Sequence, residues 1–273
     1  MARRILPGFH LSLGITLVYV AIIVVLPLGA LIFKAASLGP EDYWRIVSSD
    51  RAVASYRVTA LCALAATIFN LVFGLALAWV LVRYRFPGRR IVDALVDLPF
   101  ALPTAVAGIA LTTLFASNGW FGAPLAALGI KVSYTPLGIM IAMAFTSLPF
   151  IVRTVQPVLE ELDPALEEAG QSLGASDWAI FFRVILPLLT PALLAGLSLS
   201  FARSLGEFGA VIFIAGNQPF ETEITALLTF IRLEEYDYPA SAAIATVLLM
   251  AAFVMLAVTN LLQARALRYT VKG

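Results

Sequence analysis

Residues 166–187 read LEEAGQSLGASDWAIFFRVILP, a polar stretch set between two long apolar ones. Just before it, Asp163 is a favourable N-cap and Pro164 suits the first position of a helix. A short helix is therefore predicted to begin there and to end near Gly174. Ser176 can cap a second helix, which the final proline of the stretch should close. The pattern predicts two short helices outside the apolar segments.

The first of these helices is predicted to be amphipathic. Apolar residues recur at spacings of three and four, namely Leu162, Leu166, Ala169 and Leu173. Acidic or polar residues fill the other sides, namely Glu160, Glu161, Glu167, Glu168 and Gln171. Such a helix can lie on a bilayer, but helices of that kind usually carry Lys and Arg on the polar face. An acidic helix suits a basic protein groove better than an anionic membrane surface.

The composition indicates an integral membrane protein. Of 273 residues, 61% are hydrophobic and 13% charged, and the mean hydropathy is +0.94, far from the usual globular range. A net charge of +1, without a basic domain, gives no reason to expect nucleic acid. The single cysteine, Cys62, cannot form an intrachain disulfide and suits an ordinary buried position.

Six apolar segments are predicted to span the bilayer: residues 11–33, 58–82, 94–116, 135–152, 191–215 and 239–262. The first is too long for the core of a signal peptide, so we expect it to stay as an uncleaved helix. The fold class expected is an all-α integral membrane protein with six transmembrane helices and a cytoplasmic helical hairpin between the fourth and fifth.

The expected organisation is one membrane domain with short ends. Residues 1–57 comprise the first helix and an external loop, 58–263 the transmembrane domain with its hairpin at 160–187, and 264–273 a cytoplasmic tail. The charge distribution supports a cytoplasmic N-terminus and C-terminus, since eleven basic residues fall inside and six outside. The eleven are Arg3, Arg4, Arg83, Arg85, Arg89, Arg90, Arg153, Arg183, Arg265, Arg268 and Lys272.

Prolines interrupt two of the predicted spans. Pro99 and Pro103 should kink the third, and Pro149 should break the fourth. Asp97 would be costly if it faced lipid, so it lies either near the cytoplasmic interface or in a polar interior.

The fifth span contains an ionisable pair, Arg203 and Glu207. The two residues are four apart, so they can share a helix face and pair. Residues of this kind rarely face lipid. The pair either fixes helix packing or lines a translocation route and its gate, where Arg203 would attract an oxyanion. Gly206 and Gly209 are expected to allow close helix approach.

The hairpin resembles the EAA motif of bacterial ABC importer permeases, which has the form E-A-A, three residues, G, nine residues, I-x-L-P. The matching residues are Glu168, Ala169, Gly170, Gly174, Val184, Leu186 and Pro187. Gly170 replaces the second alanine and Val184 the isoleucine. The resemblance implies the type I permease fold. It also implies that the hairpin contains a coupling helix, which docks on a separate ATPase subunit. Glu167, directly before the motif, is assigned to the same coupling role.

Other stretches resemble the sulfate/thiosulfate permeases of ABC importers, of the subunit T type. They are SLGEFGAVIFIAGN, beginning at Ser204, and VRYRFPGRRIVDALVDLPFALPTAVAG, beginning at Val82. Molybdate permeases share only the Gly-Glu-Phe-Gly part, so molybdate or tungstate is the alternative substrate. The resemblance implies a bacterial inner-membrane complex. Its other members are a second, related permease, two ATP-binding subunits and an external sulfate-binding protein that docks on 34–57 and 216–238.

The sequence lacks the residues that several classes of activity require. No G-x-x-x-x-G-K-[ST] occurs, so the chain should not hydrolyse ATP through a P-loop. The only histidine is His10, and there is no Cys/His cluster, so we expect no catalytic residue, metal or cofactor. An ion-coupled secondary transporter remains the alternative of another class. Asp97 and Glu207 are the only candidates for the intramembrane carboxylates that it would need, and the two related halves usual in such carriers are not visible.

Overall fold

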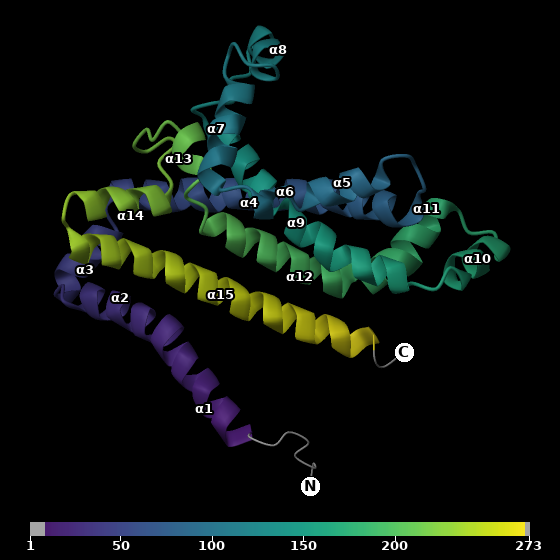
Figure 1. Cartoon of the computed structure of the whole chain (residues 1–273), viewed down its shortest axis with the longest axis horizontal. Helices are drawn as coiled ribbons and strands as arrows, with labels where there is room; N and C mark the ends of the chain where they lie inside the picture. The colour runs from purple at the N-terminus through teal and green to yellow at the C-terminus, as the bar shows by residue number, and fades with distance from the viewer. Residues whose placement is uncertain (1–8, 271–273) are drawn as a thin grey trace.

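The computed structural model describes the backbone of residues 9–270 and the side chains of residues 9 and 11–261. Throughout this part of the chain, all regular secondary structure is helical, as the composition predicts (Figure 1). Some predicted inside charges lie outside this description: Arg3, Arg4, Lys272 and the side chains of Arg265 and Arg268. The same holds for the side chain of His10.

Five segments of the described chain are long and apolar enough to cross a bilayer. They are Leu11–Ala36, Asp50–Arg83, Pro136–Glu161, Asp177–Leu205 and Tyr238–Leu261. They agree in place and order with five of the six predicted spans. Most are longer than the apolar runs, because the helices continue beyond the roughly 20 residues that cross hydrocarbon.

The first span lies at the edge of the bundle. It consists of α1 (Phe9–Val20), a π-helical turn (Ala21–Val25) and α2 (Leu26–Ala36). None of the most apolar part of this span is buried. Figure 1 shows α2 alongside α15 (Tyr238–Thr270), while α1 diverges from the bundle. Its exposed Leu, Ile and Val side chains suit contact with lipid.

The core forms where α4 (Asp50–Arg83), α9 (Pro136–Glu161) and α12 (Leu186–Leu205) pack together. Small residues allow the close contact, since Ala63, Ala66 and Ala142 are fully buried beside Met143. A buried polar chain crosses the same three helices. The amide of Asn70 donates to the hydroxyl of Ser147 at 2.9 Å, and the Ser204 hydroxyl donates to it at 3.1 Å.

The third predicted span is divided rather than kinked. It becomes α5 (Arg89–Val96), α6 (Leu98–Ala101) and α7 (Thr104–Phe115). Pro99 stands in the first turn of α6, where its missing N–H leaves no helical hydrogen bond unmade, and Pro103 precedes α7 and follows an extended residue. Of the three pieces, α7 is a shorter apolar helix. The predicted third span is therefore a broken segment and not one long helix like the other five.

Pro149 does not break the fourth span, contrary to the prediction. The helix α9 continues through Pro149 and Pro157 to Glu161. Pro149 is buried between helices, and tertiary packing of this kind holds a proline in a membrane helix despite its missing hydrogen bond.

The prediction that Pro187 closes the hairpin's second helix is also wrong. One helical rod runs from Asp177 to Leu205 through α11 (Asp177–Ile180), a π-helical turn (Phe181–Ile185) and α12. Pro187 lies in the first turn of α12, directly after the π turn. The irregular hydrogen bonding there accommodates the missing N–H. The fifth span therefore begins before residue 191, and it ends at Leu205 rather than 215.

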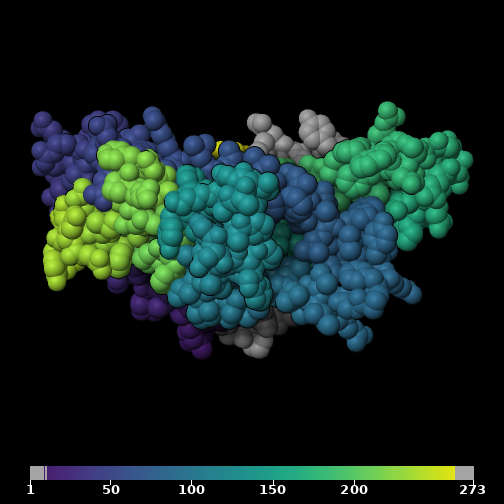
Figure 2. All heavy atoms as spheres, turned by 90° about the horizontal axis from the view of Figure 1, so that it is seen from above, coloured from purple at the N-terminus to yellow at the C-terminus, as the bar shows by residue number. Residues whose placement is uncertain are grey.

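The shorter helices gather at the two ends of the bundle. In Figure 1, α3 (Pro40–Val47) and α14 (Thr225–Glu234) lie at one end, and α10 (Ala165–Ser172) and α11 at the other. Figure 2 shows the teal residues of α7 and α8 (Gly122–Ala127) standing at the centre of another face. The same view places the green hairpin residues at one end. The hairpin and the predicted external segments therefore lie at opposite ends of the bundle, as the predicted topology requires.

Candidate functional site

The hairpin, residues 160–187, begins with a short helix whose ends are fixed by local hydrogen bonds. The Asp163 carboxylate accepts from the amide of Ala165 at 2.9 Å, which confirms the predicted capping role. At the other end Gly174 has φ +78°. The amides of Gly174 and Ala175 donate to the carbonyls of Gln171 and Gly170 at 2.9 and 3.0 Å. This is a Schellman C-cap, and it requires glycine for its backbone conformation.

The hairpin's two helices meet at Gly170. The hydroxyl of Ser176 accepts from the amide of Ala179 at 3.3 Å, as predicted for an N-cap. A Cβ added to Gly170 would lie 2.9 Å from Cγ1 of the buried Ile180. The departure from the EAA pattern at this position thus has a structural reason, because alanine would require Ile180 to move.

Part of the predicted apolar side of the hairpin is open to its surroundings. Leu166 is 42% exposed and Leu173 is 89% exposed. Trp178 and Phe182 stack at 5.8 Å between ring centroids, and both are exposed. Glu168 is exposed as well. An apolar patch beside acidic residues at the end of a membrane protein is typical of a contact with another protein.

An ion pair links the hairpin to the end of α4. Arg83 Nη2 lies 2.5 Å from Glu167 Oε1, and both atoms are shielded from solvent. The guanidinium of Arg83 also lies 5.6 Å from the ring centroid of Trp79, which meets Phe181 edge to face at 5.5 Å. Through these contacts, a movement of the hairpin would also move the end of α4.

The predicted pair of Arg203 and Glu207 forms. Arg203 Nη1 lies 2.6 Å from Glu207 Oε2, with the Glu207 side chain 1% and the Arg203 side chain 32% exposed. Glu207 stands just beyond the end of α12, and its other oxygen accepts from the amide of Ala210 at 2.9 Å. The carboxylate thus joins the helix end to the next segment, and it neutralises much of the positive charge that an oxyanion would meet.

This segment lies against α7 at two glycines. A Cβ added to Gly108 would lie 2.4 Å from the Ala210 carbonyl oxygen, and one added to Gly209 would lie 2.1 Å from Thr104 Oγ1. Gly206 has no such close neighbour. Close approach was therefore correctly predicted for Gly209 and wrongly for Gly206, which ends α12 instead.

Asp97 belongs to a polar cluster that attaches the broken third segment to α9. Arg153 donates from Nε and Nη2 to the two Asp97 oxygens at 2.8 and 2.7 Å. It also donates from Nη1 to Asp93 at 2.6 Å. The Asp97 side chain is 48% exposed, so its charge is paired and partly open to solvent.

Besides Glu207, a second carboxylate is buried, at the end of the bundle away from the hairpin. Glu223 is 1% exposed, and Arg51 donates to its two oxygens from Nε at 2.8 Å and from Nη2 at 2.6 Å. Sequence reasoning missed this pair, as it missed Arg83 with Glu167 and Arg153 with Asp93. The partners are far apart in the sequence, so no spacing signals them.

Among the described residues, no group of three or more His, Cys, Asp or Glu side chains is arranged to hold a metal ion. The sequence expectation of no metal or cofactor in this chain stays a prediction.

The bundle of spanning helices with its protruding polar hairpin agrees with the permease fold expected from the sequence. Residues 70–268 match the family described as "Binding-protein-dependent transport system inner membrane component", and the chain belongs to this family. It is therefore an inner-membrane transport component and not itself an enzyme.

Two relatives extend this similarity along almost the whole chain. The "Sulfate transport system permease protein CysT" of Escherichia coli (strain K12) is 59% identical over 97% of this chain and 95% of its own length. The protein of that name from Synechocystis sp. (strain PCC 6803) is 51% identical over 93% of this chain and 89% of its own.

Solved structures support the fold alone. A chain of a bacterial ABC transporter involved in alginate import has a TM-score of 0.77 at 17% identity, over 94% of this chain and 95% of that one. A chain of the MetNI methionine ABC transporter has a TM-score of 0.61 at 17% identity, over 84% of this chain and 99% of that one. The expected permease fold is confirmed.

Proposed function

We propose that this chain is the permease subunit of an ATP-driven ABC importer that carries sulfate and thiosulfate into the cytoplasm. The observation that supports this most directly is the 59% identity with the E. coli sulfate permease along nearly the whole of both chains. Sulfate is a strongly hydrated dianion, so its passage through hydrocarbon requires an enclosed polar path. Permease subunits supply such a path between them.

The partners belong to the same proposal. They are a second, related permease in a heterodimer, two ATP-binding subunits and an external sulfate-binding protein. One solved relative is an alginate transporter in complex with a periplasmic protein, which makes an external binding protein a reasonable partner here. In this arrangement both termini and the hairpin face the cytoplasm, and α3 and α14 face the binding protein.

The proposed mechanism assigns coupling to the hairpin. The surface made by Glu168, Ala169 and the exposed Leu173 docks on an ATPase subunit. Gly170 and Gly174 keep the two helices of the hairpin in shape, and Leu186 and Pro187 continue the hairpin into the membrane as the first residues of α12. ATP-driven closure of the ATPase dimer moves the hairpin, and the pair of Glu167 with Arg83 carries that movement to α4. Arg203 and Glu207 then hold or release the segment that follows α12 and lies against α7, next to the translocation route.

The direct test measures uptake and ATP hydrolysis together in the purified complex in liposomes. Glu168→Lys and Gly174→Val are expected to lower sulfate uptake about tenfold or more while ATP hydrolysis continues, since both alter the docking surface. The valine also faces a left-handed backbone that costs about 1 kcal/mol or more. Gly29→Val is the matched control, because Gly29 lies within α2 and a Cβ there meets nothing within 4 Å. If the two hairpin variants assemble normally and import sulfate at the parental rate, the coupling assignment is wrong.

A charge exchange tests the link between the hairpin and α4. Glu167→Arg alone places two cations together in a shielded site, and we expect uptake to fall about tenfold, the equivalent of about 1.4 kcal/mol. The double variant Arg83→Glu with Glu167→Arg restores opposite charges and should recover much of that loss. Glu161→Arg is the control, because Glu161 is an exposed hairpin acid. Equal uptake by the single and double variants would remove the pair from the mechanism.

A further inference from the structure

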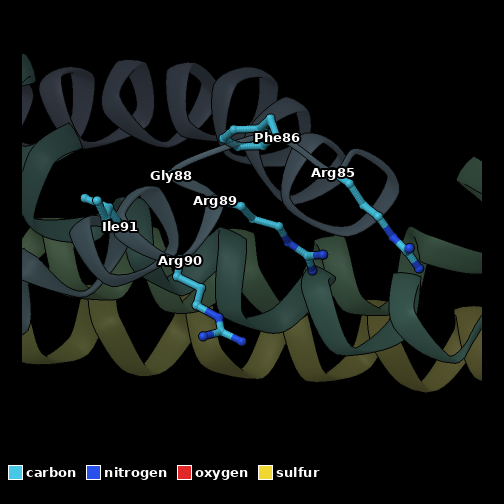
Figure 3. Close-up of a pocket in the computed structure, with 6 residues that line it drawn as sticks. All are labelled: Arg85, Phe86, Gly88, Arg89, Arg90 and Ile91. Atoms are coloured by element: carbon cyan, nitrogen blue, oxygen red, sulfur yellow. The ribbon is translucent and has the colours of Figure 1, made fainter.

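The connection between α4 and α5 carries three arginines around a surface hollow. The hollow has a volume of 440 Å³ and is lined by Arg85, Phe86, Gly88, Arg89, Arg90 and Ile91 (Figure 3). No carboxylate lines it. Across the described chain, Arg83 and Arg153 are paired with acids. The side chains of the three arginines of the hollow make no hydrogen bond or ion pair with the described residues.

The backbone brings these arginines together. Gly88 has φ +84°, and its carbonyl accepts from the amides of Ile91 and Val92 at 2.8 and 3.0 Å, which starts α5. Figure 3 shows the side chains of Arg85, Arg89 and Arg90 extending from this turn in much the same direction. Like charges held together repel one another unless an anion or water screens them. The turn therefore presents a concentrated positive charge with no counter-ion of its own.

The hollow adjoins an apolar surface at the end of a spanning helix. Ile91 is 67% exposed and Leu95, one turn further along α5, is 56% exposed. On α4, which ends at Arg83, Phe73 and Val80 are exposed. Apolar side chains exposed beside unpaired arginines are typical of the boundary between lipid tails and headgroups.

We propose that this hollow binds the headgroup phosphate of an anionic phospholipid, whose acyl chains lie along the exposed side of α4 and α5. Free sulfate is also a tetrahedral oxyanion and would meet the same guanidinium groups. The apolar surface beside the hollow favours the lipid, because sulfate has nothing to place there. The proposal requires that the chain lie in a bilayer, whatever substrate it carries.

The test uses the complex as purified in a neutral detergent and titrates it with fluorescent phosphatidylglycerol or fluorescent phosphatidylcholine. Each arginine near an anionic lipid contributes about fivefold to binding. The triple variant Arg85→Gln, Arg89→Gln and Arg90→Gln should therefore weaken phosphatidylglycerol binding on the order of a hundredfold, and each single variant about fivefold. Phosphatidylcholine binding should not change.

The control is Arg57→Gln, an exposed arginine near the opposite end of α4 and away from the hollow. It should bind phosphatidylglycerol as the parent does, and an unchanged melting temperature establishes that each variant is folded. Unchanged phosphatidylglycerol binding by the triple variant overturns the proposal. So does displacement of the lipid by sulfate beyond that caused by chloride at the same ionic strength, which would identify a free oxyanion site. Binding to the chain alone but not to the complex would mean that another subunit covers the hollow, and it too overturns the proposal.

Discussion

Gly108→Val is expected to prevent the normal accumulation of the protein in the membrane. The clash begins at the Cβ atom, which would lie 2.4 Å from the carbonyl oxygen and 2.8 Å from the Cα of Ala210. Both are backbone atoms, so no side chain can rotate away, and the cost should reach the upper end of overpacking, about 3 kcal/mol. The amount of protein in isolated membranes and the melting temperature of the purified chain measure the effect.

The control for this prediction is Gly29→Val. Gly29 lies in α2, and a Cβ there meets nothing within 4 Å, so this variant carries the same chemical change without the contact. Gly108→Ala should already show most of the loss, because alanine supplies the offending Cβ. If Gly108→Val accumulates and melts as Gly29→Val does, α7 does not rest on Ala210 in the assembled protein.

The sequence predicted those features that depend on local chemistry. Hydropathy located the first span, residues 11–33, close to the observed Leu11–Ala36. The ends of α10 followed from Asp163 and Gly174, because a cap and a left-handed glycine act within a few residues. The spacing of Arg203 and Glu207 predicted their pairing for the same reason.

The effect of each proline on its helix was predicted less well, because that effect depends on the residues packed around the proline. Pro99 and Pro103 do interrupt the helix, whereas the buried Pro149 does not. Pro187 follows a π-helical turn and leaves the rod intact. Sequence alone does not show what packs around a proline, and that packing determines whether the helix ends.

The contacts between distant segments were not predicted. Arg83 was interpreted only as an inside charge, yet it joins Glu167 and Trp79. The exposed Leu173, in contrast, agrees with the predicted amphipathic helix, because the described residues leave this part of its apolar side open.

Removing one member of the Arg203–Glu207 pair is expected to destabilise the protein by about 3–5 kcal/mol, since the other charge loses its partner in a largely buried site. Glu207→Ala should cost most, because it also leaves the amide of Ala210 without its acceptor. Arg203→Met should cost nearly as much, because Glu207, 1% exposed, would hold an unpaired charge. Melting temperature and sulfate uptake are measured for each variant.

The double variant Arg203→Met with Glu207→Gln separates the two roles that the sequence left open. Glutamine keeps an oxygen for the amide of Ala210, and neither residue remains charged, so stability should return to within about 1–2 kcal/mol of the parent. If the charges serve only packing, uptake returns with stability. If they act on the route or its gate, as we propose, the folded double variant still imports sulfate at least tenfold more slowly. Parental uptake by that variant would rule out a role in transport, because the charges would then be absent while the contact between α12 and the segment beside α7 persists.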